Sequence, residues 1–288
     1  MKKFEESRVT SNQAIVQGLK YEVPTVLIAP KNKTTGKKKM VVFINGYNGS
    51  SSMIKFWDYP VFDDVWFFSF DARGQGNNLN IASQNFKRYL KDIHLLLKYL
   101  RTQIDFDELY LIGESWGSSL VTLFNKHYPN VVDGILIWNM PYKVIDVENV
   151  DYIKQPFLKT KTFITYITKI NSHSYTNFNN KLTNNSFLIR VIKVKPKQLI
   201  SNRIHLATWK SFKRAWRVLF KSIRNNNIYY IQSESDVLSD TKYAKKLLKK
   251  SNEKKVFIIP NGSHILSFDK DDASYIFTLL DKIIQKKV

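Results

Sequence analysis

The feature that most constrains the fold of this chain is a regular alternation of short apolar segments with segments of helical periodicity. The apolar segments are rich in Val, Ile, Phe and Tyr and have the length of strands. They lie at residues 25–29, 40–45, 65–70, 109–113, 134–139, 228–232 and 256–260, and helical spacing lies at 86–100, 118–128, 241–250 and 272–284. This alternation predicts an α/β fold with a mostly parallel central sheet and helices on both of its faces. The strands before Pro30 are expected to be antiparallel and at the sheet edge.

The alternation is interrupted between two of the predicted strands. Residues 141–204 have no clear rhythm and include a polar stretch at 171–186, and an amphipathic helix is expected at 205–224. An insertion of this size is typical of a cap over the sheet. We therefore expect a single domain in which residues 1–140 and 205–288 form the core and residues 141–204 form a cap or lid.

A single serine stands between two glycines in the sequence Gly113-Glu114-Ser115-Trp116-Gly117, although the whole chain contains only 10 glycines. A simple tight turn would explain the glycines. The alternative is a nucleophile elbow, because the pattern G-x-S-x-G follows a predicted strand and precedes a predicted helix. Glycine at both flanks lets the strand and the helix approach a strained serine, whose hydroxyl then lies at a helix N-terminus. Ser115 is the predicted nucleophile.

A serine hydroxyl needs a base and an acid that orients this base. Of the five histidines, His264 is the candidate base, because it follows a predicted strand at the same sheet edge. Asp236 is the candidate acid, because it follows the preceding strand and apolar residues come directly after it; Glu234 is the alternative. The chain order Ser115, Asp236, His264 is that of α/β-hydrolases.

Catalysis by this route also needs two donors for the oxyanion, usually backbone N–H groups. One candidate is the N–H of Trp116, directly after the nucleophile. The other is the N–H of Tyr47, in the glycine-rich loop NGYNGS that follows the strand at 40–45. An ordinary Gly-Asn turn is the alternative interpretation of this loop.

With these motifs the chain resembles α/β-hydrolases of the serine-hydrolase type, close to the monoacylglycerol lipase and lysophospholipase branch, over about residues 20–140 and 205–285. NGYNGSS resembles the His-Gly loop of the family, with Asn45 in place of histidine, and FSFDARGQGNN resembles its Asp-x-Arg-Gly-x-Gly segment. The resemblance implies that Asp71 and Arg73 brace loops around the site. It also implies that the protein uses neither a metal nor an organic cofactor.

The implied function is a serine carboxylic-ester hydrolase that cleaves an acyl ester, such as a monoacylglycerol or a lysophospholipid, through an acyl-enzyme. Phe163, Trp209 and Trp216 would line the acyl pocket, or they form the packed interior of the cap. Two other functions remain open. One is a serine peptidase like the prolyl aminopeptidases, which also have a tryptophan beside the nucleophile. The other is a non-catalytic protein that binds lipid or nucleic acid.

The last alternative rests on the net charge of +21. Lysine far outnumbers arginine and is scattered along the chain, which favours a solvated shell over a specific nucleic-acid site and is compatible with weak contact with an anionic membrane.

The absence of cysteine excludes disulfides and thiolate metal sites. The N-terminal segment lacks the apolar run of a signal peptide, and no apolar stretch approaches the ~20 residues of a membrane span. We therefore expect a cytoplasmic protein, at most peripheral to the membrane; the oligomeric state stays open.

Overall fold

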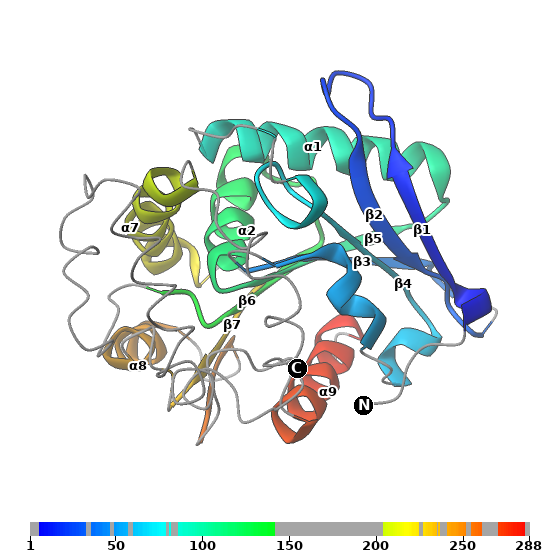
Figure 1. Cartoon of the computed structure of the whole chain (residues 1–288). Coiled ribbons are helices and arrows are strands. Elements are labelled where there is room, and N and C mark those ends of the chain that lie inside the picture. Colours follow the sequence, from blue (N-terminus) through cyan, green and yellow to red (C-terminus); the bar gives the residue numbers. More distant parts are fainter. Residues whose placement is uncertain are drawn as a thin grey trace, which may run out of the picture.

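The computed structural model of the chain describes residues 6–32, 36–46, 49–56, 60–78, 81, 86–141, 204–224, 227–234, 236, 241–251, 255–260 and 270–285. Within these ranges, eight strands form one sheet in the order β1-β2-β4-β3-β5-β6-β7-β8 (Figure 1). The strands are β1 (Val9–Ala14), β2 (Val23–Ile28), β3 (Lys39–Ile44), β4 (Trp66–Phe70), β5 (Glu108–Glu114), β6 (Gly134–Trp138), β7 (Ile228–Ser233) and β8 (Val256–Ile259).

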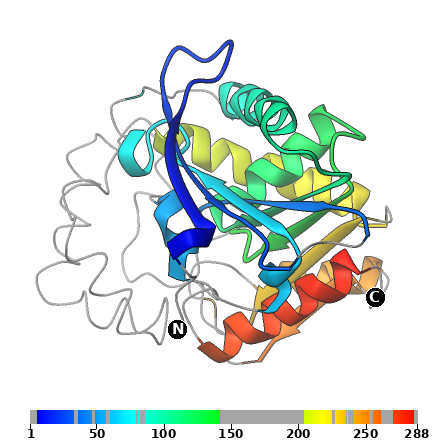
Figure 2. The ribbon, with the colours of Figure 1, turned by 90° about the vertical axis from the view of Figure 1, so that its right-hand side faces the viewer.

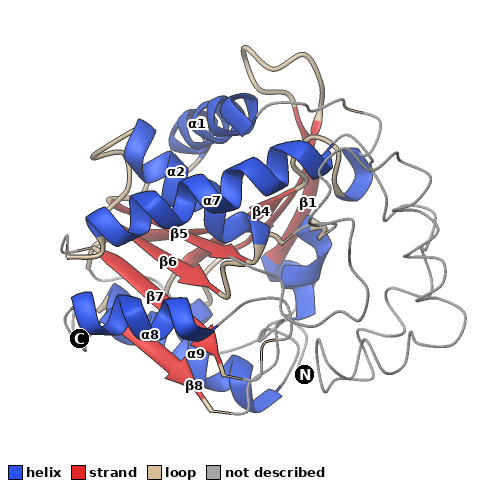
Figure 3. Ribbon diagram, turned by 90° about the vertical axis from the view of Figure 1, so that its left-hand side faces the viewer, coloured by secondary structure: helices blue, strands red, loops and turns tan. Residues whose placement is uncertain are grey.

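Helices cover both faces of this sheet. They are α1 (Phe86–Gln103), α2 (Trp116–His127), α7 (Ile204–Ser222), α8 (Thr241–Lys250) and α9 (Lys270–Ile284), with short 3-10 helices η1 (Glu6–Arg8), η2 (Ser51–Phe56), η3 (Pro60–Asp63) and η4 (Gly76–Asn78). Figure 2 shows α1, α2 and α7 on one face and α9 on the other. Helix α7 lies beside α2 (Figure 3). In the described part of the chain, no helix combines the length and the apolar character needed to cross a bilayer.

The strand directions confirm the predicted α/β fold. Strands β4, β3, β5, β6, β7 and β8 are parallel to one another, whereas β1 pairs with β2, and β2 with β4, in the antiparallel sense. The strands before Pro30 are thus antiparallel as expected, but only β1 lies at the edge. The apolar pattern does not reveal β1, because Ala14 is its only fully buried residue.

The parallel strands have continuous apolar sequences because each of them is buried on both faces. In β3, for example, Met40, Val42 and Ile44 join the core beneath α1, α2, α7 and α8. The alternate residues Val41 and Phe43 join the core beneath α9 and η3. The two faces of one strand therefore fill two separate cores.

This topology places the candidate residues at one edge of the sheet. Because β3 to β8 are parallel, the chain leaves all of them at the same edge, and this is where α/β sheets bind their ligands. The segments that follow β3, β4, β5 and β7 are described in part, and they hold most of the predicted site. Residues 142–203 lie outside the described residues, so the assignment of 141–204 to a cap stays a prediction.

Candidate active site

The backbone of Ser115 has a conformation that side-chain-bearing residues seldom adopt. Ser115 lies between the end of β5 and the start of α2, with φ 52° and ψ −114°. Its N–H donates to the carbonyl oxygen of Trp138 at 2.9 Å, and its own carbonyl accepts from the N–H of Ser118 at 3.2 Å. Strain of this kind persists only where the surrounding structure enforces it, and such positions cluster at functional sites.

The two glycines of the motif are required by close backbone contacts. A Cβ added at Gly113 would lie under 3.0 Å from backbone atoms of Gly117 and Ser118. A Cβ added at Gly117 would lie under 3.0 Å from the carbonyl oxygens of Ile44 and Asn45, at the end of β3. The strand, the helix and the loop after β3 therefore meet around Ser115 at a separation that only glycine allows, which favours the elbow over a simple turn.

Ser115 differs from all of its neighbours in exposure. From Glu108 to Phe124 every residue is buried except Ser115, which is partly exposed. It precedes the first turn of α2, where the helix dipole and the first-turn N–H groups stabilise negative charge. Burial of its neighbours on both sides holds this one hydroxyl at the sheet edge.

Ser118 and Trp116 fix the start of α2. The Ser118 hydroxyl contacts the carbonyl oxygens of Gly113 and Trp138, each at 2.5 Å, and accepts from the N–H of Trp138 at 3.0 Å. The Trp116 ring is fully buried and packs edge-on against Tyr89 with ring centroids 4.8 Å apart. The Trp116 N–H, a predicted oxyanion donor, thus belongs to a firmly anchored first turn.

The loop after β3 approaches the serine closely. A Cβ added at Gly46 would lie 3.2 Å from Ser115 Cβ and 3.4 Å from the carbonyl oxygen of Glu114. The N–H of Gly49 donates to the carbonyl oxygen of Gly46 at 3.1 Å, which closes the loop into a turn. Tyr47, the second predicted oxyanion donor, lies outside the described residues.

Asn45 supports this loop in the place where the family resemblance leads one to expect histidine. Its side chain is buried, and Nδ2 donates to Ser69 Oγ at 3.0 Å. Ser69 Oγ in turn donates to the carbonyl oxygen of Phe43 at 3.1 Å. The amide therefore joins the loop to β4 and β3.

The candidate acid is buried and held by a neighbouring amide. Asp236 is 5% exposed, and its Oδ2 accepts from Gln232 Nε2 at 3.2 Å. The Tyr230 hydroxyl donates to Gln232 Oε1 at 2.5 Å, which orients the amide. Burial, and next the charge of Asp236, raise the pKa of Tyr230 well above its ordinary value, so this hydroxyl stays protonated. The alternative acid, Glu234, is exposed.

A second pair of buried groups holds the segment that leads to the acid. Asn139 Nδ2 donates to Ser233 Oγ at 3.0 Å, and the N–H of Ser233 donates back to Asn139 Oδ1 at 2.7 Å. The end of β6 is thereby fixed to the end of β7. The pattern of the sequence did not single out Asn139, Gln232 or Ser233, because isolated polar residues at strand ends carry no local signal.

The structure brings these groups to one edge but does not describe the whole predicted set. Ser115 and Asp236 follow parallel strands at the same edge, with β6 between those strands. His264 and Phe163 lie outside the described residues, as does the side chain of Trp209 in α7. Trp216 is 1% exposed, and its indole N–H donates to the carbonyl oxygen of Pro141 at 3.1 Å. Its described contacts are those of a core residue, and a role in substrate binding stays a prediction.

Asp71 has the bracing role that the resemblance implied. Its Oδ1 accepts from the N–H of Ser51 at 2.5 Å and its Oδ2 from the N–H of Asn77 at 2.8 Å. Burial raises the pKa of the Asp71 carboxyl, and these two backbone donors oppose that change. The carboxylate therefore fastens the start of η2 to the loop after β4.

Arg73 braces the same loop against α1. Its Nε and Nη2 donate to the two carboxylate oxygens of Asp92 at 2.6 and 3.0 Å, and the Tyr21 hydroxyl donates to Asp92 Oδ2 at 2.6 Å. The Tyr89 hydroxyl donates to the carbonyl oxygen of Arg73 at 3.0 Å. These contacts join the loop after β4 to α1, which fits a structural role.

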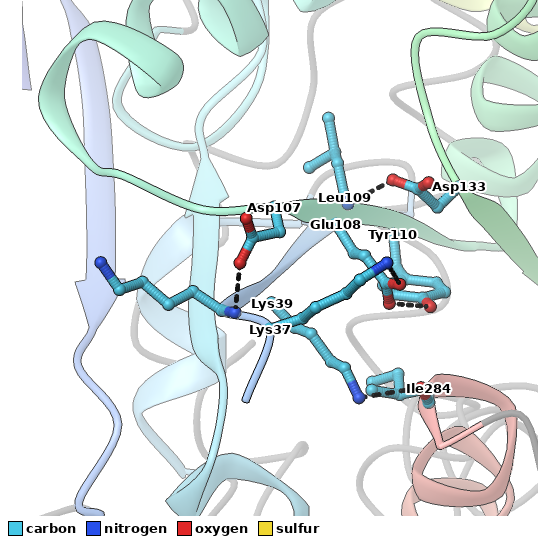
Figure 4. A network of polar contacts seen from close by, with 9 residues as sticks. Lys37, Lys39, Asp107, Glu108, Leu109, Tyr110, Asp133 and Ile284 are labelled. Atoms are coloured by element: carbon cyan, nitrogen blue, oxygen red, sulfur yellow. Dashed lines mark hydrogen bonds and ion pairs between the residues drawn. The ribbon is translucent and has the colours of Figure 1, made fainter. Parts of the chain in front are cut away.

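Other ionisable groups lie away from the serine. The network in Figure 4 is at the start of β5, where Glu108 accepts from Lys37 Nζ at 3.3 Å and from the Tyr110 hydroxyl at 2.8 Å. This is the opposite end of the strand from Ser115, so the network ties the strand to the segment before β3. Among the described residues, no group of three or more His, Asp or Glu side chains could hold a metal ion.

Comparison with known proteins identifies the family of the chain. The family described as "Serine aminopeptidase, S33" matches residues 35–271, which is more than half of the chain. An uncharacterized protein of Escherichia coli, YnbC, is 24% identical over 119 residues, which are 40% of this chain; the chain spans 20% of the length of that relative.

Several solved structures share the fold at low identity. A soluble variant of monoglyceride lipase from Saccharomyces cerevisiae is 13% identical with a TM-score of 0.61, over 95% of this chain and 96% of that one. A monoacylglycerol lipase from Paleococcus ferrophilus is 12% identical with a TM-score of 0.60, over 92% and 99%. An epoxide hydrolase from Vigna radiata is 12% identical with a TM-score of 0.62, over 98% and 99%. At these identities the similarity establishes the fold, which hosts more than one chemistry.

Proposed function

Since the chain belongs to the serine aminopeptidase S33 family and has the α/β-hydrolase fold, we propose that it is a serine hydrolase that cleaves carboxylic esters of acyl lipids. The observation that carries this proposal is Ser115. It is strained, it is the one residue between Glu108 and Phe124 that is not buried, and it directly precedes α2. A buried hydrogen-bonded carboxylate, Asp236, follows a parallel strand at the same edge.

The proposed reaction has two stages. Ser115 Oγ attacks the ester carbonyl while the His264 imidazole takes its proton, and the N–H groups of Trp116 and Tyr47 hold the oxyanion. His264 then gives the proton to the leaving alcohol, and an acyl-enzyme remains. Water attacks the acyl-enzyme by the same route, which releases the fatty acid and restores Ser115. Asp236 orients the imidazole and stabilises its cation.

The hydrogen bonds around the acid support a positioning role for Gln232. Its Nε2 holds Asp236 Oδ2, and its own oxygen is fixed by Tyr230. A rigid amide next to the carboxylate lowers its freedom to turn away from an imidazole. Gln232 therefore acts through Asp236 rather than on the substrate.

The substrate class rests on the expected cap. Residues 141–204 would cover the sheet edge, with Phe163, Trp209 and Trp216 beside the acyl chain. If the polar stretch 171–186 forms a lid, shortening it should alter the KM for long-chain esters and scarcely affect p-nitrophenyl acetate. Equal loss on both substrates would mean that this stretch supports the fold.

A peptidase function is the second candidate, because the description of the family itself names serine aminopeptidases. Both functions use the same nucleophile and the same base. They differ in the leaving group and in the need to bind a substrate amine. Turnover of p-nitrophenyl acyl esters, compared with turnover of aminoacyl anilides, separates them.

The nucleophile is tested with a fluorophosphonate probe and ester hydrolysis. Ser115→Ala should lose labelling and reduce kcat on the order of 10⁴-fold or more, since the members of a triad act as a unit. Ser222→Ala removes a hydroxyl whose bond goes to a carbonyl of its own helix, α7, and is the matched control. Asp236→Asn should remove most activity and Glu234→Gln little. Near-normal activity of Ser115→Ala would refute the assignment.

A further inference from the structure

The helices on one face of the sheet carry charge of a single sign. Helices α1, α2, α7 and α8 pack over the same core. Together, the helices α2, α7 and α8 contain lysine and arginine but no aspartate or glutamate. Helix α1 contains a single acidic residue, Asp92, which is buried and paired with Arg73. No exposed carboxylate therefore interrupts this helical layer, which we call the basic face.

The basic side chains of this face are turned to solvent. Those described as exposed include Lys91, Lys98, Lys126, Arg214, Arg217 and Lys249, from all four helices. Outside these helices, the described exposed acids are Glu22, in the turn between β1 and β2, and Asp64, Asp105, Asp107, Asp133 and Glu234, and α9 on the opposite face mixes aspartates with lysines. A lysine-rich composition accounts for the number of cations but not for this separation of the two signs.

The cations of separate helices act together where α1, α2 and α7 meet. The pKa of His127, at the end of α2, is lowered first by burial and then by Arg214, Lys126 and Lys87. Each helix thus contributes positive potential to the same region. Summed potentials of this kind attract anionic partners over distances of about 10 Å at moderate salt.

An exposed apolar side chain lies beside the basic face. The turn between β1 and β2 rises to the same side as α1 (Figure 2). Val16 and Leu19 of this turn pack into the core that α1 covers, but Ile15 is 78% exposed. Lys20 and Glu22, in the same turn, are also exposed. A large apolar side chain next to lysines can enter the boundary between lipid head groups and acyl chains.

From these observations we infer that the basic face, together with Ile15, docks on an anionic lipid bilayer. Lysine and arginine side chains bind the anionic head groups, and Ile15 inserts beside them. A nucleic acid would use the same cations but would gain nothing from an exposed isoleucine at the rim. The inference does not depend on the proposed ester hydrolysis, because it rests on other residues.

The test is co-sedimentation of the full chain with phosphatidylcholine vesicles, with and without phosphatidylglycerol. The protein should bind the anionic vesicles and be released by salt, because salt screens exposed charges. Lys98→Glu and Lys249→Glu should each lower partitioning by roughly tenfold, since each reversal removes one cation and adds one repulsive charge. Lys282→Glu makes the same change in net charge on α9, and it should have little effect.

Two further variants complete the test. Ile15→Ser should weaken the part of the binding that salt does not remove, and Ser115→Ala should bind like the wild type, which separates docking from catalysis. The inference fails if anionic vesicles are not bound or are bound no better than phosphatidylcholine. It also fails if Lys282→Glu matches Lys98→Glu, or if Ile15→Ser leaves the salt-resistant part of the binding unchanged.

Discussion

Replacing Ser115 by glycine should stabilise the protein while it abolishes catalysis. Ser115 holds φ 52° and ψ −114°, and a residue held in such a conformation costs about 1–3 kcal/mol. Glycine adopts this conformation without strain, but it adds about 0.5–1 kcal/mol of backbone entropy to the cost of folding. The mid-range values predict a gain of about 1 kcal/mol in the free energy of unfolding. Ser115→Ala keeps the Cβ and should therefore keep the stability of the wild type.

The assay pairs urea unfolding, followed by tryptophan fluorescence, with hydrolysis of p-nitrophenyl acetate. Each kcal/mol corresponds to roughly 2–4 °C in Tm for a protein of this size class, so thermal unfolding gives an independent check. Asn130→Gly is the matched control. Asn130 also has positive φ, 64°, but asparagine tolerates that conformation, so its replacement should gain less.

Two results would refute the reasoning. If Ser115→Gly is no more stable than Ser115→Ala, the backbone of the elbow stores no strain. If Ser115→Gly hydrolyses the ester at the rate of the wild type, the serine is not the nucleophile. A more stable and inactive glycine variant is the outcome that links the strain to function.

Three further predictions concern the surroundings of the site. Gln232→Leu should lower kcat for esters with little change in KM, because it frees Asp236 to turn. Partial recovery of kcat in Gln232→Asn, which keeps an amide donor, would support positioning, and an unchanged kcat in Gln232→Leu would exclude it. Arg73→Met should lower the free energy of unfolding by about 3–5 kcal/mol in urea titrations, because it leaves buried Asp92 without its cation. Asp92→Asn leaves no buried negative charge, so a smaller loss of stability in that variant would agree with this cause. Burial lowers the pKa of His94 below the usual value, so the imidazole of the unfolded state is protonated at a higher pH than that of the folded state. The free energy of unfolding should therefore be greatest above about pH 6.5 and fall as the pH decreases below it. His94→Gln should reduce this pH dependence, and an unchanged dependence in that variant would assign it to other groups.

The sequence by itself determined the fold class and pointed to the proposed nucleophile. Strands buried on both faces must be apolar, so the six parallel strands and β2 are visible as apolar runs among the eight described strands, whereas polar β1 is not. The elbow is also a local property: Gly113 and Gly117 are needed wherever a strand, a strained serine and a helix meet within five residues. Neither feature depends on which strands are neighbours.

Only the tertiary structure decided which polar groups support the site. Asn45 bonds Ser69 because β3 lies beside β4, and Asn139 bonds Ser233 because β6 lies beside β7, and no local pattern encodes that order. The same holds for the basic face. Basic residues from four helices far apart in sequence meet on one side because these helices pack over the same core, and the helices carry no exposed acid.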